Sequence, residues 1–148
     1  GVPEGPIDLT PERALMLEAG LDRLGAVDFE KRCYVGQEVT ARTHYRGLVK
    51  RRLVPLTIAG DPPAIDSDIA WHGTVIGKSK TAASLAGPIT GKHEHKDAKS
   101  ICLALLKLSD LHIILDASAN DDGLTINGHA AALALADWMQ PLPRPAKP

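Results

Sequence analysis

The spacing of apolar residues changes after Gly47, and this change limits the fold more than any other feature of the chain. Before Gly47 the pattern suits helices, and after it apolar residues alternate, which predicts a strand over residues 49–59. The alternating residues are Val54, Leu56 and Ile58. Because Pro55 has no backbone N–H, this strand is expected to lie at a sheet edge or to carry a bulge.

Short apolar runs separated by turn residues continue the pattern. His72-Gly73 and Asn127-Gly128 are each flanked by such runs, and both dipeptides predict hairpin turns. The expected strands are 69–71, 74–80, 101–108, 124–126 and 130–136, with a helix from Ser109 to about Ala117. Strands of this length and spacing predict a small antiparallel β-barrel, and the helices before it make the fold class α+β.

Two helices are expected before the barrel. Gln37 and Glu38 suit a first helical turn and Gly47 suits the position after a helix end, which predicts a helix over residues 37–46. Thr10 and Pro11 suit the cap and first position of another helix, expected over residues 11–19.

Positive charge concentrates between residues 31 and 52, although the whole chain has a formal net charge of −1. The cations are Lys31, Arg32, Arg42, Arg46, Lys50, Arg51 and Arg52. Against the single anion Glu38, they give this segment a charge of +6. Cys33 lies among these cations and before the expected helix, which favours its thiolate and predicts a lowered pKa. A structural turn holding a half-buried cysteine is the alternative reading of the same residues.

The run Lys31-Arg32-Cys33-Tyr34-Val35-Gly36-Gln37-Glu38, with Ala41-Arg42 and Arg46-Gly47 after it, resembles the signature of the YgfZ family. That family comprises folate-binding relatives of the glycine-cleavage T-protein. The matching residues are Lys31, Cys33, Tyr34, Gly36, Gln37, Glu38, Arg42 and Gly47. Arg32 departs from the pattern, because the family usually has glycine there.

The resemblance implies a domain organisation. Residues 1–47 would be the end of a T-protein-like folate-binding region, and residues 48–140 the antiparallel barrel. Residues 141–148 are expected to be a disordered tail because they are rich in proline. The chain would then be the C-terminal part of a longer protein.

The resemblance also implies a cofactor, tetrahydrofolate or a derivative. The residues expected to bind it are Lys31, Tyr34, Gly36, Gln37, Glu38 and Arg42. Cys33 would act in redox or cluster-related chemistry. Glu18 and Asp22 lie in a stretch similar to one that lines the folate pocket, so they face either a ligand or solvent.

Three classes of function remain open. The resemblance favours a folate-dependent accessory protein for iron-sulfur cluster assembly or repair, rather than a classical enzyme. Its partners would be the assembly machinery or its client proteins. A T-protein-like aminomethyltransferase is the second class. The third is a module that binds tRNA, with the run Lys50-Arg51-Arg52 neutralising phosphates.

Other sites are not favoured by the sequence. His93-Glu94-His95 lies in a Lys-rich stretch typical of a solvated loop, so no metal is expected. Cys102 lies in an apolar run and is predicted to act as a small hydrophobic residue. No apolar run approaches the ~20 residues of a membrane-spanning helix, and a cytoplasmic location is expected.

Overall fold

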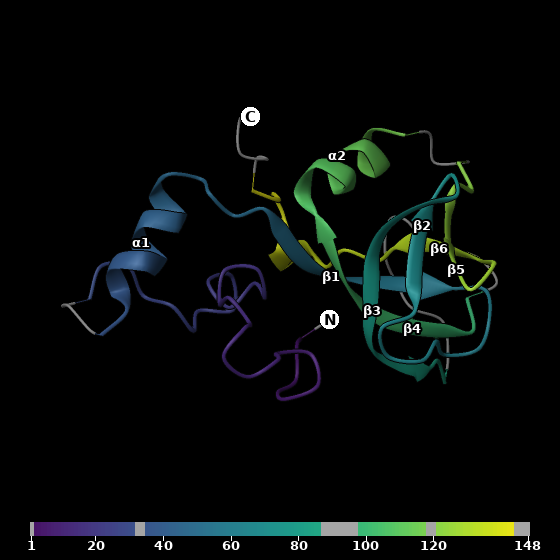
Figure 1. The fold of residues 1–148 in the computed structure, drawn as a ribbon, viewed down its shortest axis with the longest axis horizontal. Coiled ribbons are helices and arrows are strands. Elements are labelled where there is room, and N and C mark those ends of the chain that lie inside the picture. Colours follow the sequence, from purple (N-terminus) through teal and green to yellow (C-terminus); the bar gives the residue numbers. More distant parts are fainter. Residues whose placement is uncertain (1, 32–34, 87–97, 118–120, 144–148) are drawn as a thin grey trace.

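The strands expected after Gly47 close into an antiparallel β-barrel (Figure 1). The computed structural model describes residues 2–31, 35–86, 98–117 and 121–143. Its strands are β1 (Arg51–Ile58), β2 (Asp68–Trp71), β3 (Thr74–Ser84), β4 (Ser100–Lys107), β5 (Leu124–Ile126) and β6 (His129–Leu133). Around the barrel they follow the order β1-β4-β3-β2-β5-β6, and β6 pairs with β1 to close it. The predicted α+β class with a small antiparallel barrel is therefore confirmed.

Both predicted hairpin turns are present. His72 and Gly73 have φ angles of 46° and 79° between β2 and β3, and Asn127 and Gly128 have φ angles of 51° and 78° between β5 and β6. Positive φ at both central residues is the geometry of the turns that match the twist of a hairpin. Asn and Gly accept such angles readily, which is why Asn127-Gly128 could be recognised from the sequence.

β1 is buried on both faces. Val54, Leu56 and Ile58 point into the core and are at most 1% exposed, as the alternation predicts. The residues between them are buried as well. The outer face is covered by the chain that precedes α1 (Gln37–Tyr45), which lines pockets with Leu53 and Pro55.

The prediction that Pro55 marks a sheet edge or a bulge is wrong. Pro55 pairs with Leu103 in a regular ladder, inside a closed barrel. Its carbonyl accepts a hydrogen bond from the N–H of Ala134, just past the end of β6. The N and O of one strand residue point to the same side. The missing N–H of Pro55 therefore faces Ala134, just past the end of β6, so the pairing with β6 lacks one bond at its end and the pairing with β4 is unaffected.

The helix α2 (Leu108–Asp116) follows β4 without a loop and packs on the barrel. Lys107 occupies its N-cap position, so the helix begins before the predicted Ser109. Leu108 and Leu111 are fully buried in the core. The short 3-10 helix η1 (Asp137–Met139) follows β6, and Leu142 beyond it also lies in the core. Of the predicted tail, residues 144–148 lie outside the described residues.

The predicted helix over residues 11–19 is not formed. The N–H groups of Arg13 and Ala14 bond to the carbonyl of Thr10, but Glu12 has a φ of 62° and turns follow. The carbonyl of Glu18 accepts a hydrogen bond from Leu53 in β1 instead of from a helical turn. Tertiary contact with the barrel has therefore overridden the local helical signals.

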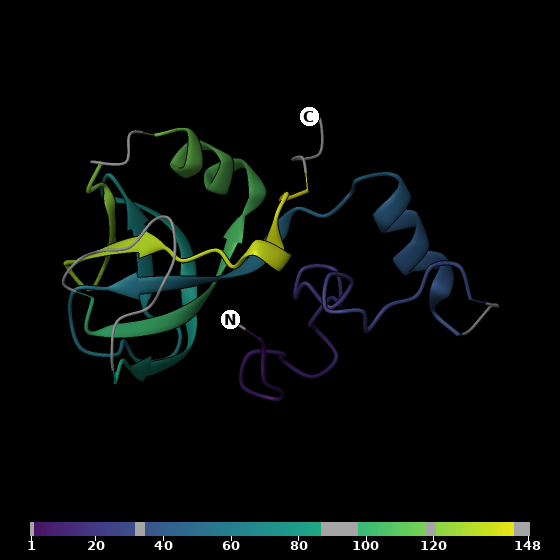
Figure 2. The same ribbon diagram turned by 180° about the vertical axis from the view of Figure 1, so that it is seen from behind.

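α1 lies at the end of the molecule farthest from the barrel, and residues 2–30 run between the two (Figures 1 and 2). Its bounds agree with the helix predicted over 37–46. No helix in the part of the chain that the structure describes has the length and apolar character needed to cross a membrane.

Candidate functional site

Two glycines set the ends of α1. Gly36 is the N-cap residue and has a φ of 88°, and Gly47 follows the helix with a φ of 62°. The N–H of Gly47 bonds to the carbonyl of His44 at 3.1 Å, and that of Leu48 bonds to Thr43 at 2.9 Å. This pair of bonds is the Schellman motif, which requires a left-handed residue. Both glycines of the signature therefore have a conformational role.

The described signature residues lie on the surface. None of the residues of α1, all within the described part of the chain, is buried. Arg42 and Glu38 form an ion pair one helical turn apart, with Nη2 and Oε1 separated by 3.4 Å and side chains 57% and 85% exposed. An exposed pair of this kind contributes only about 0.3–0.5 kcal/mol. Both groups can therefore exchange it for a ligand at little cost.

The loop before α1 is only partly described. Asp28 Oδ1 accepts hydrogen bonds from the N–H groups of Glu30 and Lys31, at 2.9 and 3.2 Å, which forms a turn. The side chain of Lys31 is exposed. Cys33 and Tyr34 lie outside the described residues, so their predicted roles stay predictions. The structure thus brings Gly36, Gln37, Glu38 and Arg42 together on one helix.

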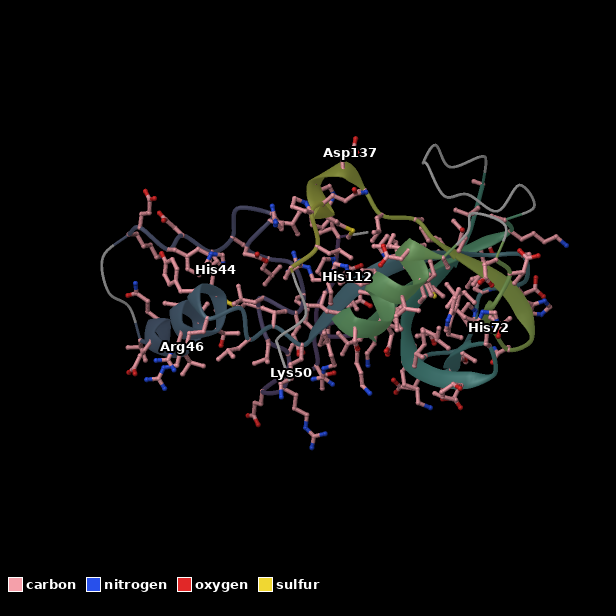
Figure 3. All side chains as sticks on the ribbon, turned by 90° about the horizontal axis from the view of Figure 1, so that it is seen from above. His44, Arg46, Lys50, His72, His112 and Asp137 are labelled. Carbon is pink, nitrogen blue, oxygen red and sulfur yellow. The ribbon has the colours of Figure 1, made fainter. Side chains whose placement is uncertain are left out.

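Three aromatic rings hold α1 against the chain that precedes it. Phe29 stacks on His44, with ring centroids 3.9 Å apart, and Tyr45 meets both rings edge-on. Phe29 is half-buried, whereas Tyr45 is 70% exposed. Figure 3 shows His44 and Arg46 at this end of the molecule.

The cation cluster of the sequence divides into two groups in space. Arg46 and Lys50 are exposed (Figure 3), whereas Arg51 and Arg52 bind the loop 17–22. Only part of the run Lys50-Arg51-Arg52 is thus available to phosphates.

The carboxylates of Glu18 and Asp22 are largely shielded from solvent and are paired with arginines of β1. Arg51 donates to Glu18 from Nε and Nη2, both at 3.1 Å, and Arg52 Nη1 lies 3.2 Å from Asp22 Oδ1. The carboxylate side chains are 11% and 12% exposed. The reading of these residues as solvated carboxylates is wrong, because they form ion pairs that join the loop to β1. The sequence could not show this, because the partners are 33 and 30 positions apart. The reading that they face a ligand stays a prediction.

Arg52 is the most deeply buried charged side chain of the described residues, at 2% exposure. Its Nη1 also donates to the carbonyl of Leu17 at 2.5 Å, while Nη2 has no hydrogen-bond partner within the described chain. Burial lowers the pKa of Arg52, and the charge of Asp22 opposes this shift. Gly20, with a φ of 80°, lies against the guanidinium, where a side chain would be 3.3 Å from Nη2.

The sequence contained one signal for this position. Arg52 has the same parity along β1 as Val54, Leu56 and Ile58, so extending the alternation back by two residues places it on the inner face. Because Lys50 and Arg51 precede it, Arg52 is instead predicted to belong to an exposed cationic run.

Cys102 is a packing residue, as predicted. It is 1% exposed, and burial raises the pKa of its thiol to about 12. Its thiolate is therefore absent at neutral pH. Among the described residues no three His, Cys, Asp or Glu side chains are placed to hold a metal ion. His93-Glu94-His95 lies outside the described residues.

The helix after Cys33 does not lie against the barrel. α1 lies at the far end of the molecule, and the loop 17–22 makes the junction through Arg51 and Arg52 (Figure 1). Sequence order placed α1 directly before the strands, but the linker at 46–50 carries it away from the barrel.

The chain is similar to proteins named for iron-sulfur cluster assembly. It is 38% identical over 138 residues to iron-sulfur cluster assembly factor IBA57 homolog, mitochondrial, of Mycosarcoma maydis, across 82% of this chain and 34% of that protein. The corresponding protein of Coccidioides immitis is 47% identical over 124 residues, 75% of this chain and 29% of the relative. The Mus musculus IBA57 is 50% identical over 64 residues, 43% of this chain and 18% of the relative. No protein-family model matches the chain.

The names of these relatives correct one expectation. All three are called mitochondrial, so the predicted cytoplasmic location is wrong. The chain spans about a third or less of each relative's length. Over most of its own length it is therefore similar to one part of the IBA57 iron-sulfur cluster assembly factors.

Proposed function

We propose that the chain is part of a mitochondrial accessory protein that supports iron-sulfur cluster assembly or repair. The observation that carries the proposal is the 38% identity to an IBA57 homolog across 82% of the chain. The signature from Lys31 to Gly47 supports it, because its two glycines have the conformations that the helix ends require.

A reduced folate fits the chemistry of the described signature residues. Arg42 keeps most of its guanidinium N–H groups for a ligand, since a single 3.4 Å contact joins it to Glu38. A guanidinium binds carboxylates such as the glutamate of a folate, and the Gln37 amide can donate and accept. Lys31, Tyr34, Gly36 and Glu38 complete the proposed set. Tetrahydrofolate would supply a reduced pterin that carries one-carbon groups.

A substitution at Cys33 tests the proposed role in iron-sulfur cluster assembly. The full-length protein carrying Cys33→Ser should fail to restore the activity of mitochondrial iron-sulfur enzymes in cells that lack IBA57, because serine cannot act as a thiolate. Its melting temperature should stay nearly unchanged, since the two side chains are almost isosteric. Cys102→Ala, which keeps the thiol at position 33, is the control and should complement. A Cys33→Ser variant that complements fully while losing several degrees of melting temperature would make Cys33 a packing residue.

A substitution at Arg42 tests the proposed binding of folate. Calorimetric titration of the full-length protein with tetrahydrofolate should show an affinity about tenfold lower for Arg42→Ala, the usual size of a charge-assisted hydrogen bond. Arg46→Ala removes an exposed arginine that follows the same helix and should bind like the parent protein. Equal affinity for all three proteins would remove Arg42 from the site. Titration with tRNA at two salt concentrations distinguishes folate binding from phosphate binding.

A further inference from the structure

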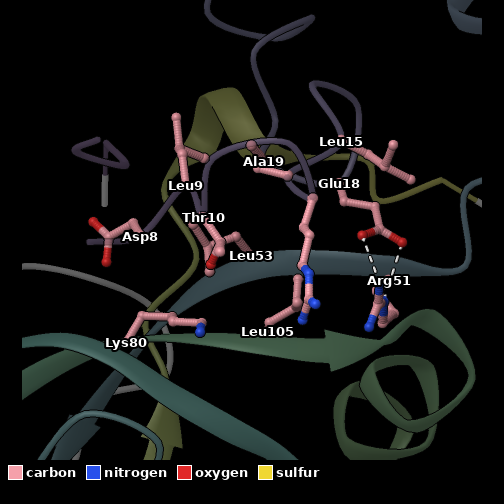
Figure 4. A pocket seen from close by; sticks show the side chains of 12 residues that line it. Asp8, Leu9, Thr10, Leu15, Glu18, Ala19, Arg51, Leu53, Lys80 and Leu105 are labelled. Atoms are coloured by element: carbon pink, nitrogen blue, oxygen red, sulfur yellow. Dashed lines mark hydrogen bonds and ion pairs between the residues drawn. The ribbon is translucent and has the colours of Figure 1, made fainter. Parts of the chain in front are cut away.

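A pocket of about 200 Å³ lies between the N-terminal segment and the barrel, away from the signature helix (Figure 4). Its charged lining residues are Asp8, Arg13, Glu18, Arg51 and Lys80. Leu53 and Ala19, at 5% and 6% exposure, belong to its apolar part together with Leu105. The pocket thus has an apolar wall and a charged rim.

The carboxylates that line this pocket already accept hydrogen bonds inside the protein. Asp8 accepts backbone hydrogen bonds from Glu4 through Oδ2 and from Thr81 through Oδ1, both at 2.9 Å. Both oxygens of Glu18 accept from Arg51, as the dashed lines in Figure 4 show. Each of these four carboxylate oxygens thus already accepts one hydrogen bond inside the protein, which leaves it less available to a ligand that donates.

Donors remain. Arg13 lines the pocket and forms no hydrogen bond or ion pair through its side chain with any described residue. The Lys80 ammonium points into the pocket in Figure 4 and bonds to Asp66 at 3.2 Å, which uses one of its three N–H groups. Its side chain is only 16% exposed, so water competes weakly for the other two. The free groups of the pocket are therefore cationic donors beside an apolar wall.

We propose that this pocket binds a small carboxylate with an apolar body. The carboxylate would accept from Arg13 and Lys80, and the body would cover Leu53 and Leu105. At roughly 30 Å³ per water molecule, the pocket holds about seven waters, which is the room needed by a single ring or a short branched chain. None of the signature residues that the structure describes lines it, so the proposal does not depend on folate binding.

The experiment titrates the chain with benzoate and with benzamide, its uncharged counterpart, and follows backbone amide shifts by NMR. Benzoate should shift Ala19, Leu53 and Leu105 with a Kd on the order of 1 mM, as expected for a ligand of this size. Benzamide should bind at least tenfold more weakly, because its uncharged amide cannot form the charge-assisted hydrogen bonds that a carboxylate forms with Arg13 and Lys80. Inorganic phosphate should also bind more weakly, because it leaves the apolar wall exposed to water.

Arg13→Gln should weaken benzoate binding about tenfold without unfolding the protein, since Arg13 is exposed and has no partner among the described residues. Lys50→Gln removes an exposed cation outside the pocket and serves as the matched control. Equal binding of benzamide and benzoate, an affinity that Arg13→Gln leaves unchanged, or no benzoate shifts at these three residues would each overturn the proposal. Phosphate binding as tight as that of benzoate would exclude the apolar body as part of the recognition.

Discussion

Arg52 is a charged residue at a core position, and its surroundings explain how the fold tolerates it. The guanidinium lies within 3.2 Å of Asp22 Oδ1 and donates to the Leu17 carbonyl, so loss of hydration is partly offset by an opposite charge and a hydrogen bond. Gly20 leaves the space that the planar group needs. The burial of Arg52 therefore depends on Leu17, Gly20 and Asp22 together, although nothing in the sequence links these residues to Arg52.

Replacing Arg52 by methionine should lower the free energy of unfolding by about 3 kcal/mol, because Asp22 would remain nearly buried without its counter-charge. Urea denaturation of this chain measures the loss. Arg46→Met, at an exposed position, should change stability by less than about 0.5 kcal/mol. A loss below about 1 kcal/mol for Arg52→Met would show that the buried pair contributes little.

At the level of elements, the sequence predicted correctly those turns and helices that depend on residues close together in the chain. The turns at His72-Gly73 and Asn127-Gly128 and the helix between Gly36 and Gly47 depend on φ preferences that a few residues determine. The helix predicted over residues 11–19 is absent because this segment bonds to β1 instead. The carbonyl of Glu18 accepts from the N–H of Leu53, a contact between distant parts of the sequence. The candidate site divides in the same way: the α1 residues were predictable, and the pairing of Glu18 and Asp22 was not.

α1 should be the least protected regular element. A helix of nine residues with no buried side chain is far shorter than the ~12–15 residues at which an isolated helix becomes even marginally stable. Amide hydrogen exchange followed by NMR should give protection factors below about 10 in α1, because it opens without global unfolding. The amides of β1, buried on both faces, should exchange only at the rate set by global unfolding. Similar protection in both elements would mean that α1 is covered in solution.

On the scale of the whole molecule, the N-terminal segment and the barrel form one unit, and α1 projects from it (Figure 2). Leu17 belongs to the same apolar core as the barrel residues, and Asp8, Glu18 and Asp22 bond to β3 and β1. The continuous burial of β1 follows from this packing. Alternation within β1 could reveal its inner face, but only the course of residues 2–19 explains why its outer face is apolar too.

This arrangement predicts the result of limited cleavage by a protease specific for arginine. Arg42 and Arg46 are exposed in and after α1, whereas Arg52 is buried. Of the arginines from α1 to β1, those near α1 should therefore be cut before Arg52, because local opening there is easy. The N-terminal fragment should nevertheless remain bound to the barrel through Leu17 and the three carboxylates, and the two should elute together on size exclusion.

The Arg52→Met variant provides the comparison, since it removes the charge that holds Asp22 and the donor to the Leu17 carbonyl. After the same cleavage its N-terminal fragment should elute separately from the barrel at a lower urea concentration than the parent fragment does. Arg46→Met should lose one cleavage position and retain the parent's association. If the fragments of the parent protein separate at once in buffer, the N-terminal segment of the uncut protein is held on the barrel mainly by its covalent link through α1. The ion pairs at β1 would then be too weak to join the two parts, because the effective concentration provided by the linker would supply most of the association.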